Sequence, residues 1–171
     1  MDSYADQDFF SIACGKLIVN LVNAPNALSG CSTRTMFTQY GYKRVWAQAI
    51  TEAMAVMLIE GITVRSPRDL ENGKIRNLHL LLSLPTWVLN LYLTLSGRQL
   101  DGKTSMLQDL EANRGTEIDY LTGYISKWGK LVNVPTPVSD SLVALVKKAE
   151  ADKVGSPNMS PEALLQAAGL R

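Results

Sequence analysis

Hydrophobic residues recur three or four positions apart through most of this chain, which is the spacing of one face of an α-helix. Between positions 42 and 60 the pattern includes Val45, Ala49 and Ala53, with no interrupting Gly or Pro. Gly61 then stands where a C-terminal cap belongs. The pattern predicts a long core helix over residues 42–60.

Similar signals predict three helices toward the C-terminus. A helix is expected to start at Thr116, where Asp119 three positions later completes a capping box, and to end before Pro135. Two more are expected over residues 139–153 and 160–169, the last with a serine cap, a proline in its first turn and a glycine at its end.

Strand signals are missing from the sequence. No segment alternates β-branched residues between hairpin turns, and no repeat of fixed period is present. The sequence therefore predicts an all-α fold, a compact multi-helix bundle. Because 171 residues is an ordinary length for one domain, we expect residues 1–171 to form a single helical domain.

The most hydrophobic stretch, LHLLLSLPTWVLNLYLTL at positions 78–95, is about long enough to cross a membrane. His79 and Asn90 are among the residues that interrupt it. Proline disfavours helix in the residue before it and readily starts a new one, so we interpret the stretch as two buried helices that meet at Pro85. Trp87 is then expected in the core, and no membrane partner is expected.

Polar residues form a stripe along the aliphatic segment at positions 15–30. Lys16, Asn20 and Asn23 fall at i, i+4 and i+7, which places them on one helical face about 10 Å long. Aliphatic residues fill the other directions, so the helix is predicted to be buried. Because burying an unpartnered ammonium is costly, something polar should face the stripe.

Two interpretations of the stripe remain open. In the structural one, Lys16 extends to solvent and the asparagines cap neighbouring helix ends. In the functional one, the stripe lines a pocket for a small polar anion. Lys16 then supplies charge and a proton, Asn20 and Asn23 orient the ligand, and Ser105 and Glu117 approach from other helices.

Charge and composition exclude several classes of function. Seventeen basic and sixteen acidic residues give a net charge of +1 without a basic cluster, so nucleic acid is not an expected partner. Cys14 and Cys31 have no zinc spacing and His79 is the only histidine, so no metal site is predicted. Free thiols and the lack of a signal-peptide pattern favour the cytoplasm.

Three blocks of sequence carry a resemblance to a known family. They are SMLQDLEANRGTEIDYLTGYISKWGKLVNVPTP at 105–137, GKLIVNLVNAPNAL at 15–28, and EAMAVMLIEGI at 52–62. Together they resemble the C-terminal substrate domain of ketopantoate reductase (2-dehydropantoate 2-reductase) over most of residues 13–150. The order SMLQD, TEID and VPTP is specific to that resemblance.

The resemblance implies an all-helical domain of the 6-phosphogluconate dehydrogenase-like type. Such a domain joins a Rossmann domain and helps to reduce the 2-oxo group of ketopantoate with hydride from NADPH, a step of pantothenate biosynthesis. Lys16 matches the lysine that donates a proton to the carbonyl oxygen, and Glu117 matches an acid near it. Asn20 and Ser105 match substrate contacts. Asn23 is a candidate from the stripe alone, because Ala24 occupies the position of the family's second asparagine.

The nucleotide half of such a reductase is not visible in this sequence. No G-x-G-x-x-G follows a predicted strand, so NADPH binding would need a Rossmann domain in cis or in trans. The sequence predicts the substrate-binding, proton-donating domain of an NADPH-dependent 2-oxo acid reductase, inactive without that partner. The alternative is a non-catalytic helical interaction or dimerisation module derived from the family, with a second copy of the chain as its partner.

Overall fold

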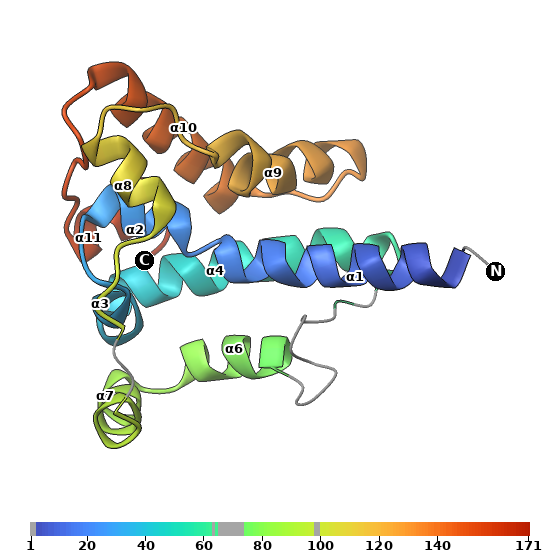
Figure 1. Cartoon of the computed structure of the whole chain (residues 1–171), viewed down its shortest axis with the longest axis horizontal. Helices are drawn as coiled ribbons and strands as arrows, with labels where there is room; N and C mark the ends of the chain where they lie inside the picture. The colour runs from blue at the N-terminus through green and yellow to red at the C-terminus, as the bar shows by residue number, and fades with distance from the viewer. Residues whose placement is uncertain (1–2, 63, 65–73, 98–99) are drawn as a thin grey trace.

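The computed structural model describes residues 3–62, 64, 74–97 and 100–171, and helices hold 71% of the chain. No strand occurs in these residues, so the all-α prediction is confirmed. Two long helices, α1 (Ser3–Asn20) and α4 (Tyr40–Ile59), run along the longest dimension of the molecule (Figure 1). The other helices are shorter: α2 (Asn23–Ser29), α3 (Thr33–Thr38), α6 (Lys74–Ser83), α7 (Thr86–Leu95), α8 (Ser105–Glu111), the 3-10 helix η1 (Ile118–Tyr120), α9 (Thr122–Leu131), α10 (Pro137–Asp152) and α11 (Pro161–Ala167).

Buried apolar side chains gather in two clusters. One lies between α1 and α4 and includes Ile18 and Ile50, with Ile125 of α9 packed against them. The other joins α2, α8, α10 and α11 at the opposite end of α4, around Leu28 and Leu107. The two clusters give α4 a buried face over most of its length, which explains its uninterrupted apolar spacing.

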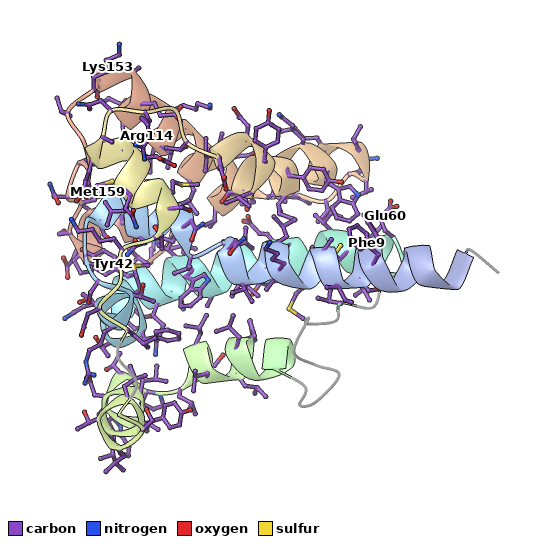
Figure 2. All side chains as sticks on the ribbon, viewed as in Figure 1. Phe9, Tyr42, Glu60, Arg114, Lys153 and Met159 are labelled. Atoms are coloured by element: carbon purple, nitrogen blue, oxygen red, sulfur yellow. The ribbon has the colours of Figure 1, made fainter. Side chains whose placement is uncertain are left out.

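The C-terminal segment folds back onto the start of α4. The hydroxyl of Tyr42 donates a hydrogen bond to the carbonyl of Met159 at 2.7 Å, and both residues are labelled at the same end of the molecule in Figure 2. The next residue, Ser160, accepts a bond from the Ala163 amide at 3.2 Å as the cap of α11. The predicted start signal of this helix is therefore the one used.

The predicted helix from Thr116 is divided into two. η1 is followed by Leu121 with φ −108° and ψ −98°, and only then does α9 begin. The expected capping box is wrong, since the Thr116 amide donates instead to Glu150, at 2.7 Å. Asp119 pairs with Lys147 at 2.6 Å. The Thr116 amide is therefore bound by Glu150 of α10 and not, as the local pattern predicted, by Asp119.

The stripe prediction also needs correction, because α1 ends at Asn20 and a new helix starts at Asn23. Proline has no amide hydrogen, so Pro25 cannot bond the carbonyl of Leu21, and the chain turns there instead of continuing as one helix. Lys16 and Asn20 share a face of α1, whereas Asn23 belongs to a different element.

Helices α6 and α7 meet at Pro85 as predicted, but they are not buried. Trp87 is 69% exposed, which contradicts its expected place in the core. Only one side of α7, with Leu89 and Leu93, is buried, against α3. The chain between the two helices is held by the ammonium of buried Lys43, which donates to the carbonyl of Leu84. Burial lowers the pKa of this lysine.

Membrane insertion has no support from the helices that the structure describes: none of them combines the length and the apolar character that a bilayer crossing requires.

Candidate functional site

A hollow of about 420 Å³ lies between α1 and the segment that leads from Glu117 through η1 into α9. In Figure 1, α9 lies above α1 and runs in the opposite direction. Three polar residues line the hollow, namely Lys16, Asn20 and Glu117. Its volume falls within the range of small-molecule sites. Three of the five residues singled out from the sequence are therefore brought to one pocket by elements about 100 positions apart.

Lys16 and Asn20 reach the pocket because they are one helical turn apart on α1. The prediction that this helix is buried on all sides is wrong: Lys16 is exposed and Val19 is 45% exposed. One side of α1 packs on α4 through Ile18, and another side is open to the pocket. The ammonium therefore keeps its hydration while it faces the hollow, which removes the cost of burying it.

The backbone before Glu117 is fixed by Glu150 of α10. One oxygen of this carboxylate accepts hydrogen bonds from the amide and the hydroxyl of Thr116, both at 2.7 Å. The Thr116 hydroxyl in turn accepts a bond from the Ile118 amide at 3.2 Å. Glu117 thus sits between two residues whose backbone amides are held, and its own side chain is exposed to the pocket.

A chain of charges supports this arrangement. Lys147 lies 2.6 Å from Asp119 and 3.2 Å from Glu150. Burial alone would raise the pKa of Glu150, but the hydrogen bonds from Thr116 and the Lys147 ammonium outweigh it and hold that pKa below its ordinary value. The hydrogen bond from Lys147 likewise lowers the pKa of Asp119, and the pKa of Lys147 is raised in return. These carboxylates are therefore held in their charged form.

Ser105 and Asn23 are not among the residues that line the hollow. Ser105 is exposed at the first position of α8, and Asn23 is buried in the first turn of α2. These two helices are joined by Asn26, whose side-chain oxygen accepts bonds from the amide (3.3 Å) and the hydroxyl (2.8 Å) of Thr104. Thr104 is the cap of α8, so Asn26 positions the helix start that carries Ser105.

Aromatic rings form the other end of the pocket, which sequence reasoning missed. Phe10 of α1, Tyr120 of η1 and Tyr124 of α9 line it, and Trp128 lies behind two of them. The spacing of 120, 124 and 128, four apart, is a signal that was present in the sequence. Spacing alone does not tell a buried stripe from one that borders a hollow, so this signal does not identify a pocket by itself.

The described residues contain neither a metal-binding cluster nor a strand. Across the described ranges, no three His, Cys, Asp or Glu side chains are placed to hold a metal ion. A dinucleotide normally lies on a glycine turn between a strand and a helix. The described residues contain no strand, and we assign no cofactor contact to them.

Solved structures define the class of fold. A PanE/ApbA family ketopantoate reductase from Ralstonia eutropha superposes with a TM-score of 0.62 at 23% identity, covering 82% of this chain and 41% of that one. D-mandelate dehydrogenase, solved with NADH and anilino(oxo)acetate, gives a TM-score of 0.61 at 24% identity and covers 82% and 40%. The fold is that of a helical domain found in these larger reductases, of which this chain spans less than half.

Sequence comparison then identifies the family. The family described as ketopantoate reductase PanE/ApbA C terminal matches residues 8–150, and the chain belongs to it. Over 51 residues it is 47% identical to the 2-dehydropantoate 2-reductase of Mesorhizobium japonicum, a match that covers 30% of this chain and 16% of that protein. Over 47 residues it is 53% identical to that of Lactococcus lactis, covering 27% and 15%. The family resemblance of the three sequence blocks is confirmed.

Proposed function

We propose that residues 1–171 are one helical domain that binds the substrate and donates the proton in an NADPH-dependent reductase of 2-oxo acids. The observation that carries this proposal is the convergence of Lys16, Asn20 and Glu117 on one pocket. Membership of the ketopantoate reductase family supports the reaction type. We place the protein in the cytoplasm, which the free thiols favour.

The hydride would come from NADPH held by a Rossmann domain, in cis or in trans. When a 2-oxo group accepts a hydride at carbon, negative charge builds on its oxygen. An ammonium at that oxygen stabilises the charge and gives up a proton, so that the product is a 2-hydroxy acid and the lysine is left neutral. Lys16 is the ammonium that the pocket offers, and solvent can reprotonate it because it is exposed.

The other residues position the reacting groups. Glu117 supplies a carboxylate in the same pocket that orients Lys16, and Asn20, one turn along from Lys16 on α1, fixes the substrate with its amide. Ser105 and Asn23 remain proposed substrate contacts. Neither lines the present hollow, where Lys16, Asn20 and Glu117 are the proposed contacts.

The test restores a nucleotide-binding domain by fusion or complementation and measures turnover of 2-oxo acids. Lys16→Ala should then lower kcat by about 10²–10⁴-fold, the usual range for loss of a general acid. Lys127→Ala is the matched control, because Lys127 is an exposed lysine on α9 that does not line the pocket. If the two variants have the same kcat, Lys16 is not the proton donor.

The alternative function is an interaction module, and one observation favours it. Trp87, Leu91 and Leu95 lie four apart on α7 and are 69%, 53% and 78% exposed, so they form an apolar face that no described residue covers. A related structure is described as a dimeric ketopantoate reductase from Staphylococcus aureus, which makes a second copy of this chain the proposed partner. Sedimentation of the wild type and of Leu91→Lys tests this alternative. A wild-type dimer that the variant abolishes supports the interaction module, and a wild-type monomer contradicts it.

A further inference from the structure

The candidate pocket has two chemically different ends. Lys16, Asn20 and Glu117 give it a polar end with one charge of each sign. Phe10 and Tyr124 give it an aromatic end, and Tyr120 also faces the hollow. A site built only for the carboxylate and carbonyl of a very small acid would need the first end and not the second.

The aromatic end is held together by Trp128. The Trp128 ring lies with its centroid 6.2 Å from that of Phe10 and 5.5 Å from that of Tyr124, the latter edge to face. These distances are those of favourable aromatic pairs. Phe10 comes from α1 and Tyr124 from α9, so the tryptophan fixes two walls that belong to different helices.

The separation of the two ends follows from helix geometry. Phe10 precedes Lys16 by six residues on α1, an axial rise of about 9 Å. Tyr124 lies at the same end as Phe10, because both rings lie against Trp128. A methyl or ethyl group next to a carbonyl at Lys16 would leave the aromatic rings uncovered, whereas a phenyl ring reaches toward them.

The charged residues of the pocket also limit which 2-oxo acids it can bind. Lys16 and Glu117 are the charged residues among the described lining, and both belong to the polar end. Ala13 and Cys14 on α1, and Leu121 after η1, lie between the two ends in chain order. A second carboxylate on the substrate would meet no cationic side chain other than Lys16 among the lining residues, so its desolvation would be costly.

We propose that the pocket selects 2-oxo acids that carry an aryl or similarly large apolar group, with Phe10 and Tyr124 as the residues that determine this specificity. The proposal rests on the proposed function, since it takes the 2-oxo acid class from it. The carboxylate and carbonyl bind at the polar end, and the aryl group fills the space beside the rings that Trp128 supports.

The experiment measures binding to the 171-residue chain without a cofactor. Phenylglyoxylate and 2-oxobutanoate are titrated while the tryptophan indole signals are followed by NMR. Phenylglyoxylate should bind at least about tenfold more tightly and shift the Trp128 signal, and Phe10→Ala should remove about that factor. Phe9→Ala is the control, because Phe9 is the neighbouring exposed phenylalanine and does not line the pocket (labelled in Figure 2). Lys16→Ala should weaken both acids.

The outcomes separate the two proposals. Equal affinity for the two acids, or equal effects of Phe10→Ala and Phe9→Ala, overturns the aryl specificity, while loss of binding in Lys16→Ala still supports the 2-oxo acid site. If neither acid binds, or if Lys16→Ala changes nothing, the proposed function fails and the specificity fails with it. A perturbed Trp128 signal together with sensitivity to Phe10→Ala supports both.

Discussion

Glu52 of α4 holds Ser139 at the start of α10: one oxygen of the carboxylate accepts hydrogen bonds from the Ser139 amide at 2.8 Å and from its hydroxyl at 2.7 Å. The other oxygen accepts from the Val138 amide at 2.8 Å. Glu52 is 4% exposed. A carboxylate on one helix therefore caps another, 86 residues along the chain, and satisfies first-turn amides that have no partner within their own helix.

Glu52→Ala should destabilise the fold by about 2–4 kcal/mol, because it leaves two buried amides and a buried hydroxyl without acceptors. Urea unfolding followed by circular dichroism measures this. Glu60→Ala is the control, since Glu60 is an exposed glutamate at the end of the same helix. A Glu52→Ala variant as stable as the control would show that water replaces the carboxylate.

The same carboxylate gives stability a pH dependence. Burial raises the pKa of Glu52 above its ordinary 4.5, although the hydrogen bonds from Ser139 and Val138 oppose the shift. The folded chain then binds this proton more tightly than the unfolded chain. The free energy of unfolding therefore falls as pH rises from 4.5 through the raised pKa, and is constant above it.

Glu52→Gln should remove that slope, because glutamine does not titrate. The measurement is the difference in unfolding free energy between the wild type and Glu52→Gln at several pH values from 4 upward. We expect the wild type to lose stability relative to the variant as the pH rises. A difference that stays constant, or that changes in the wild type's favour, contradicts the raised pKa.

The helix ends show what a single sequence can and cannot predict. The cap at Ser160 and the break at Pro85 depend on neighbouring residues only, and both are where the pattern placed them. The backbone at Thr116, where the helix was expected to start, is held by Glu150, 34 residues away, and there the local capping pattern failed. Partners distant in sequence leave no mark on local spacing, so a local rule cannot find them.

Some residues of the candidate site could likewise be predicted from the sequence, and others could not. Lys16 and Asn20 share a face because helical spacing fixes it, and Glu117 joins them as the family resemblance implied. Asn23 lies elsewhere, because the helix of Lys16 ends at Asn20 and a second helix, which contains Pro25, starts at Asn23. Glu52 carried a usable signal: it lies three residues after Ala49 on the buried face of α4, where a charged residue needs a partner.

Gly41→Ala should destabilise the fold even though alanine is the better helix former. An added Cβ at Gly41 would lie 2.3 Å from the carbonyl oxygen of Pro161, a backbone atom that cannot move aside without displacing α11. Overpacking of this kind costs about 1–3 kcal/mol, which exceeds the helix gain of about 1 kcal/mol. Thermal unfolding measures it. Gly115→Ala is the control, because nothing lies within 4 Å of its added Cβ, and equal effects would contradict the close approach.

The last prediction concerns Glu150, which acts on the site through Thr116. Its carboxylate accepts hydrogen bonds from the amide and the hydroxyl of Thr116, both at 2.7 Å, and its side chain is 16% exposed. Glu150→Ala should cost about 1–3 kcal/mol through the unpaired amide and the weakened charge network. It should also release the backbone that carries Glu117, so that hydrogen exchange quickens in residues 116–121 while that of α11 stays unchanged.

The pH dependence of this contribution has the opposite sign to that of Glu52. Because the folded pKa of Glu150 lies below its ordinary 4.5, the stabilisation is fully present above pH 4.5 and is lost as the pH falls through the folded pKa.

Glu111→Ala is the matched control for Glu150→Ala. Glu111 also pairs with a lysine, Lys103 at 2.7 Å, but its side chain is 40% exposed, so its loss should cost less than about 1 kcal/mol. If Glu150→Ala resembles this control in stability and in exchange at 116–121, Glu150 does not position the site.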